Sequence, residues 1–404
     1  MATGGKVRPV RAIVLGIIGA LVAVALVVVG FAMLEPAPRR PPVVERPPLP
    51  IIDPIEQYAD DRLSVMTLDE KIQSMFMIHI VGINAAQFEA TADANNLGGF
   101  ILMGDNIPDP ADGLSSMTSA MNVEAGLPLL IGIDQEGGIV RRIDTDQAAS
   151  AEELRYLPPE AARAAFASRG ALLDGLGVTM NFGIVADVTG DPSSFIFERS
   201  MGATGADAAA RVAQAVAGEA GLVWSTLKHF PGHGVSPGDS HSSIPTTAIG
   251  LDEWRTSHAL PFLAGIDAGA EVVMMGHLQF DAVDAKPATL SPLWNDVLRN
   301  DLGFEGLVIT DDMSMLERSG RPELANQASN AIAAVAAGNT ILLYVGGVDV
   351  AGVTAAVHAA VDAGTLSEAL IDDAAHRLLI ARRTLSGETG RFVHCFDECQ
   401  AIIE

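Results

Sequence analysis

The chain has 404 residues, a net charge of −25 and a hydrophobic fraction of 49%. So acidic a surface repels phosphate backbones, which argues against nucleic acid as a partner. When the first fifty residues are set aside, the remaining stretch of about 350 residues suits either one large α/β barrel or two ordinary domains.

Residues 1–34 have the pattern of a membrane anchor or export signal. Lys6, Arg8 and Arg11 precede an apolar run from Ala12 to Leu34. At a rise of about 1.5 Å per residue, a helix of this run crosses a hydrocarbon core of about 30 Å. The basic flank predicts that the N-terminus stays cytoplasmic and that the rest is exported. We therefore expect a membrane-anchored protein with an extracytoplasmic domain, or a secreted one if the segment is cleaved as a signal peptide.

A proline-rich linker and a short tail flank the predicted domain. Residues 35–50 hold seven prolines and are typical of an extended spacer. The two cysteines, Cys395 and Cys399, lie in the predicted tail at residues 391–404. In an exported protein they can form a local disulfide, but their spacing does not decide whether they pair.

Residues 51–390 alternate between short apolar runs and Ala-rich helical stretches. The predicted strands are Met75–Val81, Gly98–Met103, Leu129–Ile133, Thr179–Val185, Gly221–Leu227, Glu271–Met275, Gly306–Thr310 and Thr340–Tyr344. The predicted helices are Ala161–Leu176, Gly205–Ala220, Asp252–Asp267, Pro292–Asn300, Pro322–Ala337, Val350–Ala363 and Ser367–Leu385. Eight strands in regular alternation favour a single (β/α)8 barrel of the TIM type over a doubly wound open sheet.

Polar residues follow five of the predicted strands. In a (β/α)8 barrel the reactive groups lie at the C-terminal ends of the strands, so these residues are expected to meet at one mouth. They are Asp134, Gln135 and Glu136, then Asp187, then Lys228 and His229, then His277, and finally Asp311 and Asp312.

The densest group of titratable residues follows the predicted strand Gly221–Leu227. It consists of one lysine, one aspartate and three histidines, namely Lys228, His229, His233, Asp239 and His241. The glycines and prolines between them predict an adjustable loop. Asp239 can orient the imidazole of His241 and favour its protonated form, as a general acid/base requires. A metal site made by the three histidines, or a plain polar loop, is the alternative interpretation.

Two further segments carry candidate site residues. Asp311 follows an apolar strand and can point an oxygen into the barrel mouth, where a carboxylate can attack an anomeric carbon. By strand alternation its neighbour Asp312 points elsewhere, which suggests either a helix N-cap or a residue that supports the site residues without touching the ligand. After another strand, Gly137 and Gly138 permit a sharp turn, and Arg142 can then fold back beside Asp134 to bind a ligand.

Three motifs together resemble the family 3 glycoside hydrolases and, within them, the NagZ-like β-N-acetylglucosaminidases. They are Lys228–Gly234 with Asp239–His241, Ile133–Gly138, and Ile309–Met313. The similarity spans residues 55 to 385. It implies a (β/α)8 barrel that removes terminal β-linked N-acetylglucosamine with retention, through a covalent glycosyl-enzyme.

The resemblance also implies roles for single residues. Asp311 matches the family's nucleophile, His241 its acid/base, and Asp239 the partner of that histidine. Five residues match positions that hold the sugar's hydroxyl groups: Asp134, Arg142, Arg199, Lys228 and His229. We expect neither a metal nor another cofactor.

The expected function is thus an exo-β-N-acetylglucosaminidase acting outside the membrane on peptidoglycan fragments or related glycans. A β-glucosidase and an N-acetylglucosaminide phosphorylase are alternatives within the same family. A non-catalytic glycan-binding protein and a metal hydrolase using the loop histidines are alternatives of other classes.

Overall fold

A computed structural model describes Met1 and residues 53–122, 124, 126–236 and 238–392. In this part of the chain no helix is long and apolar enough to cross a bilayer. The predicted anchor at residues 12–34, the linker at 35–50 and both cysteines lie outside the described residues. The described strands and helices all belong to the compact unit that begins at Ile52.

The centre of the molecule is a nearly closed barrel of eight parallel strands. In the order of the sheet they are β10 (Leu342–Tyr344), β1 (Phe76–Ile78), β2 (Gly99–Leu102), β3 (Leu130–Ile133), β4 (Met180–Val185), β5 (Trp224–Phe230), β7 (Val272–Met275) and β9 (Leu307–Thr310). A parallel bridge between Ile309 and Ile341 joins the two ends of the sheet. The eight predicted strands and their barrel arrangement are confirmed.

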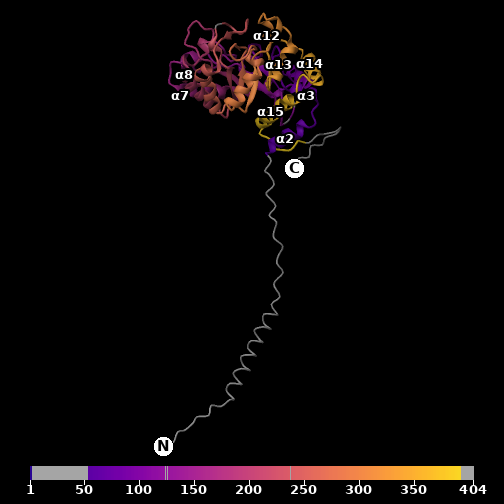
Figure 1. The fold of residues 1–404 in the computed structure, drawn as a ribbon. Helices are drawn as coiled ribbons and strands as arrows, with labels where there is room; N and C mark the ends of the chain where they lie inside the picture. The colour runs from indigo at the N-terminus through magenta and orange to yellow at the C-terminus, as the bar shows by residue number, and fades with distance from the viewer. Residues whose placement is uncertain (2–52, 123, 125, 237, 393–404) are drawn as a thin grey trace. The chain divides into compact units, whose positions relative to one another are not determined.

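Helices surround the strands (Figure 1). The bounds are α2 (Pro54–Leu63), α3 (Leu68–Ser74), α4 (Ala85–Asn95), α5 (Leu114–Ala120), α6 (Ala151–Leu154), α7 (Pro159–Gly175), α8 (Gly205–Glu219), α9 (Leu251–Thr256), α10 (Ala259–Asp267), α11 (Pro292–Asp296), α12 (Ser314–Arg318), α13 (Gln327–Ala336), α14 (Val350–Asp362) and α15 (Glu368–Ser386). Helix α15 packs outside the barrel as predicted, where Arg382 donates hydrogen bonds to the carbonyls of Leu127 and Pro128.

Two predicted helices are not continuous, and one of them, Pro322–Ala337, forms a 3₁₀ turn at Pro322–Leu324 followed by the separate helix α13. The stretch from Asp252 to Asp267 forms two helices, α9 and α10, separated at Ser257 and His258. Pro261 accounts for the break, because it has no N–H to donate to the carbonyl of Ser257 and its ring would clash there.

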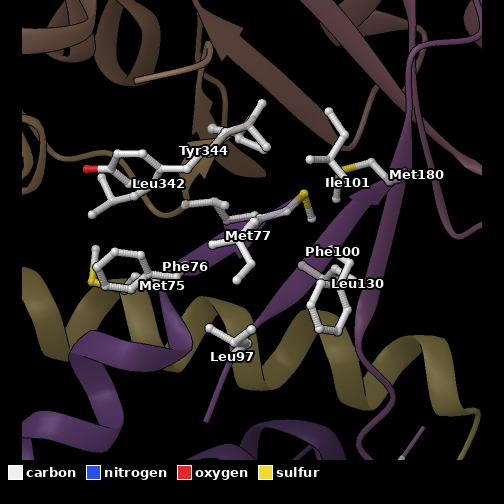
Figure 2. Close-up of a cluster of buried hydrophobic side chains, with 14 of the residues drawn as sticks. Met75, Phe76, Met77, Leu97, Phe100, Ile101, Leu130, Met180, Leu342 and Tyr344 are labelled. Atoms are coloured by element: carbon white, nitrogen blue, oxygen red, sulfur yellow. The ribbon is translucent and has the colours of Figure 1, made fainter. Parts of the chain in front are cut away.

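The barrel interior and the layer around it are densely packed. Figure 2 shows a cluster of these buried apolar side chains, in which Phe76 of β1 stacks on Tyr344 of β10 with ring centroids 5.9 Å apart. Inside the barrel, Gly132 of β3 leaves room for the ring of Phe182 of β4, which a Cβ atom would overlap. The barrel is therefore a filled core, and a ligand can enter only at its mouth.

Strand β5 extends further than predicted. Lys228, His229 and Phe230 belong to the strand and are buried, whereas the sequence suggested that an adjustable loop begins at Lys228. The aromatic ring of Phe230 explains the difference, because it packs edge-on against Trp254, Phe262 and Trp294. Lys228 and His229 are consequently held on a rigid element.

Two short strands brace the far end of the loop that follows β5. Strands β6 (Thr246–Thr247) and β8 (Gln279–Phe280) pair in parallel, and Gln279 N–H donates to the carbonyl of Pro245 at 3.0 Å. At the near end, Gly234 lies so close to the carbonyl of Val188 that a Cβ atom would not fit. The segment carrying Asp239 and His241 is thus fixed on both sides.

Candidate active site

The mouth of the barrel holds a cavity of about 360 Å³. It is lined by Ile101, Met103, Asp134, Val140, Arg142, Arg199, Lys228, His229, Ser240, His241, Met274, Asp311, Asp312, Met315, Arg318, Leu343 and Val345. Seven of the eight predicted site residues are among them, because parallel strands bring their C-terminal ends to one edge. The eighth, Asp239, does not line the cavity but contacts His241, which does.

Asp134 joins two cations in the cavity. Its Oδ1 accepts a hydrogen bond from Lys228 Nζ at 2.9 Å, and its Oδ2 accepts one from Arg142 Nη2 at 3.0 Å. Burial opposes ionisation of Asp134, but the charges of Lys228 and Arg142 outweigh it and lower the pKa of the carboxyl. The prediction that Arg142 folds back to lie beside Asp134 is confirmed.

Glu136 is a site residue for which the sequence suggested no role. Its carboxylate accepts two hydrogen bonds from Arg199, from Nε at 2.9 Å and Nη2 at 2.7 Å, and lies 2.6 Å from Lys228 Nζ. Burial opposes ionisation, yet the charges of Arg199 and Lys228 lower the pKa of Glu136. Its position after a strand was the only signal in the sequence, because Arg199 lies 63 residues further along the chain.

Asp187, also without an assigned role, organises the histidines. One carboxylate oxygen lies 2.7 Å from His229 Nδ1, and the other accepts the backbone N–H groups of His229 and His233. Burial opposes ionisation, but His229 and His233 lower the pKa of Asp187 to about 2. A carboxylate at Nδ1 makes that nitrogen the donor, so His229 Nε2 can accept from Arg199 Nη2 at 3.3 Å.

Asp311 directly follows β9 and lines the cavity. Its Oδ1 accepts the backbone N–H of Asp312 at 2.8 Å, and no described residue donates a hydrogen bond to its Oδ2. Burial opposes ionisation, but His229, His277, the Asp312 N–H and Lys228 together lower the pKa of Asp311. The residue is therefore a carboxylate at neutral pH, with one oxygen available to a ligand.

The neighbours of Asp311 have structural contacts. The carboxylate of Asp312 accepts hydrogen bonds from the N–H and hydroxyl of Ser314, from Val345 N–H and from Arg318. His277 is buried, with its ring nitrogens 2.9 Å from the Thr289 hydroxyl and from the carbonyl oxygen of Asp312. Asp312 thus ties the end of β9 to α12, but the N-cap of α12 is Met313 and not Asp312, so the predicted N-cap was wrong.

Asp239 and His241 form a pair at the entrance. Asp239 Oδ1 lies 2.6 Å from His241 Nδ1 and accepts the His241 backbone N–H at 3.0 Å. Burial opposes ionisation of Asp239, but these two hydrogen bonds and the charge of His241 lower its pKa. The His241 side chain is 62% exposed and still lines the cavity. Its Nε2 is thereby left to act on a bound molecule.

The three histidines of the alternative metal-site interpretation do not converge in the structure. Each has a separate partner, Asp187 for His229, Ser240 for His233 and Asp239 for His241. Burial lowers the pKa of His233 to about 4, so it is a neutral ring that positions Ser240. Within the described ranges no group of three or more His, Cys, Asp or Glu side chains is arranged to hold a metal ion.

Comparisons with known proteins agree with this geometry. Residues 67–381 match the family model described as glycosyl hydrolase family 3 N terminal domain. A β-hexosaminidase of Methylococcus capsulatus is 33% identical over 255 residues, which cover 61% of this chain and 75% of the relative. A β-hexosaminidase of Stenotrophomonas maltophilia is 36% identical over 215 residues, covering 50% of this chain and 63% of the relative.

Solved structures show the same architecture. A family 3 β-N-acetylglucosaminidase from a Paenibacillus species superimposes with a TM-score of 0.74 at 30% identity, covering 84% of this chain and 66% of that one. A β-N-acetylhexosaminidase from Beutenbergia cavernae gives 0.69 at 30% identity, covering 78% and 98%. The chain belongs to family 3 of the glycoside hydrolases.

Proposed function

We propose that this glycoside hydrolase is an exo-acting β-N-acetylhexosaminidase that removes terminal β-linked N-acetylglucosamine with retention at the anomeric carbon. The observation that carries the proposal is that Asp311 and His241, which follow different strands, line one cavity. The identity of the sugar is supported by relatives and structural neighbours named as β-hexosaminidases or β-N-acetylglucosaminidases.

The proposed first step forms a glycosyl ester. Asp311 attacks C1 of the sugar, the bond between C1 and the glycosidic oxygen breaks, and the imidazolium of His241 gives its proton to that oxygen. In the second step neutral His241 takes a proton from water, whose oxygen attacks C1 and releases the Asp311 carboxylate. Asp239 orients the ring of His241 and stabilises its positive charge in the first step.

The cavity's lining supports binding of one terminal sugar. Its volume of about 360 Å³ lies at the lower end of the usual range for ligand pockets, roughly 300 to 1,000 Å³. Asp134, Arg142, Arg199, Lys228 and His229 offer charged donors and acceptors to the sugar's hydroxyl groups. An apolar part of the wall suits the methyl of an acetamido group, and it is formed by Ile101, Met103, Met274, Leu343 and Val345.

We further propose that the domain acts outside the cytoplasmic membrane on peptidoglycan fragments. This proposal rests on the basic and apolar pattern of residues 1–34 and on the glycan that such a location offers. The location is tested by fractionating cells that express the full chain and cells that express a variant lacking residues 1–34. Recovery of the full chain in the cytosol contradicts it.

Trapping of the intermediate tests the reaction. A fluorinated N-acetyl sugar should become attached to the peptide containing Asp311, as a mass increase in the digested protein, and the first product seen by NMR should be the β anomer. Labelling of another carboxylate, or an α product, contradicts the proposal.

Parallel assays separate the alternatives. Faster cleavage of a β-glucoside than of the matching N-acetylglucosaminide indicates a β-glucosidase, and formation of a sugar 1-phosphate in added phosphate indicates a phosphorylase. Sugar binding without turnover indicates a glycan-binding protein.

A further inference from the structure

The charge of the cavity differs from that of the chain. The chain as a whole carries −25. Against this, the cavity's lining contains four residues that are cationic at neutral pH, Arg142, Arg199, Lys228 and Arg318, and three carboxylates, Asp134, Asp311 and Asp312. The acidic chain therefore gathers four cations at one cavity, where Asp134, Glu136 and Asp312 pair with them.

The inner cations are neutralised within the site, whereas Arg318 stands at the entrance. The side chain of Lys228 is 2% exposed, and Asp134 and Glu136 accept its hydrogen bonds or lie within ion-pair distance. The side chain of Arg318 is 52% exposed. His241, the proposed proton donor to the leaving group, is similarly exposed. Both side chains therefore line the cavity and reach solvent.

Two hydrogen bonds hold Arg318 in place and leave other N–H groups of its guanidinium available to a ligand. Its Nη1 donates to the Ser314 hydroxyl at 2.8 Å, and its Nη2 donates to Asp312 Oδ2 at 3.0 Å. A guanidinium has five N–H donors, so these two bonds leave others for a ligand. Because α12 begins at Ser314, two residues after Asp312, the guanidinium is tied to the segment that carries the proposed nucleophile.

We propose that Arg318 determines specificity by binding a negative charge on the leaving group, either a carboxylate or a phosphate monoester. The inference rests on the proposed function, in which a glycoside is cleaved in this cavity. The planar guanidinium binds both anions through paired N–H bonds. The acidic surface elsewhere repels the same anions, so productive binding is favoured only where Arg318 offsets that repulsion.

The experiment compares leaving groups of the same shape and different charge. Values of kcat/KM are measured for 3-carboxyphenyl and 3-carbamoylphenyl β-N-acetylglucosaminides, and a phosphophenyl glycoside distinguishes carboxylate from phosphate as the preferred anion. The wild type should prefer an anionic glycoside over the neutral amide. Arg318→Gln should reduce that preference about tenfold, equivalent to about 1.4 kcal/mol, and Arg318→Lys should keep part of it.

The control is Arg321→Gln. Arg321 donates to Gln279 and does not line the cavity, so its loss should leave the preference unchanged. Added salt should weaken the wild-type preference and have little effect in Arg318→Gln, since an exposed ion pair is screened.

Two results overturn the inference while leaving the proposed function intact. One is a wild type whose kcat/KM for the neutral amide equals its kcat/KM for each of the two anionic glycosides. The other is an Arg318→Gln variant whose kcat/KM falls equally for all three, as expected if Arg318 only supports Asp312. If the wild type cleaves none of the three, the proposed function fails and the inference fails with it.

Discussion

Replacing Glu136 with Gln should destabilise the protein and weaken sugar binding together. The carboxylate is 2% exposed and faces Arg199 and Lys228 at 2.6 to 2.9 Å. The Gln side chain has nearly the same shape as Glu, but it carries no negative charge. Its amide N–H group would also face Arg199 or Lys228, and two hydrogen-bond donors cannot bond to each other. Breaking a buried ion pair by removing one partner costs about 3–5 kcal/mol. We expect the lower value, because Lys228 keeps Asp134 as a partner.

Thermal denaturation at neutral pH measures this effect. At roughly 2 °C per kcal/mol for a domain of this size, the midpoint should fall by about 6 °C, and KM should rise because Arg199 and Lys228 lose their fixed positions. The folded-state pKa of Glu136 is lowered, so its stabilisation is present above the ordinary glutamate pKa and is lost as pH falls through the folded value. The difference between wild type and variant should therefore shrink in acid.

A surface pair provides the control. Asp144 and Arg141 form an exposed ion pair, so Asp144→Asn should change the stability by no more than about 0.5 kcal/mol. A Glu136→Gln protein with the midpoint and KM of the wild type would refute the reasoning.

Three other substitutions probe the site and its support. Asp311→Asn should lower kcat on a chromogenic N-acetylglucosaminide about 10³-fold or more, and full activity would remove Asp311 as nucleophile. Asp239→Asn should lower kcat roughly 10²- to 10⁴-fold and flatten its pH profile, whereas a merely structural residue would leave the shape of that profile intact. Glu219 is buried beside Asn181 and Ser225, and burial raises its pKa to about 8. The wild type should therefore lose stability as pH rises from the ordinary glutamate range to about 8, and Glu219→Gln should abolish this loss in denaturant titrations at several pH values; an identical pH dependence in both proteins contradicts the assignment.

The barrel was predictable because most of its strands are short apolar runs, and five of the predicted strands are followed by polar residues. Asp134 and Asp311 are clear examples, since each directly follows such a run and each lines the cavity. The same rule placed Lys228 and His229 at the mouth. It did not predict that β5 continues through them, because the burial of Phe230 depends on aromatic rings that arrive from α9, α10 and α11.

The partners within the site were not predictable in the same way. Glu136 with Arg199, and Asp187 with His229, are pairs of residues 63 and 42 positions apart. Their contacts depend on how neighbouring strand ends meet in three dimensions, which no local pattern encodes. The pair Asp239 and His241 could be predicted because the two residues are only two positions apart.

The braced segment that bears His241 also has a consequence for protein engineering. The proposed sugar ligands Asp134, Lys228 and His229 lie in or directly after barrel strands, while the proposed proton donor His241 belongs to a loop segment held at Gly234 and at the β6–β8 pair. Such a segment can be exchanged between these two points as a module. Shortening it to omit Asp239 and His241 should convert the hydrolase into a lectin-like receptor that still captures the terminal sugar.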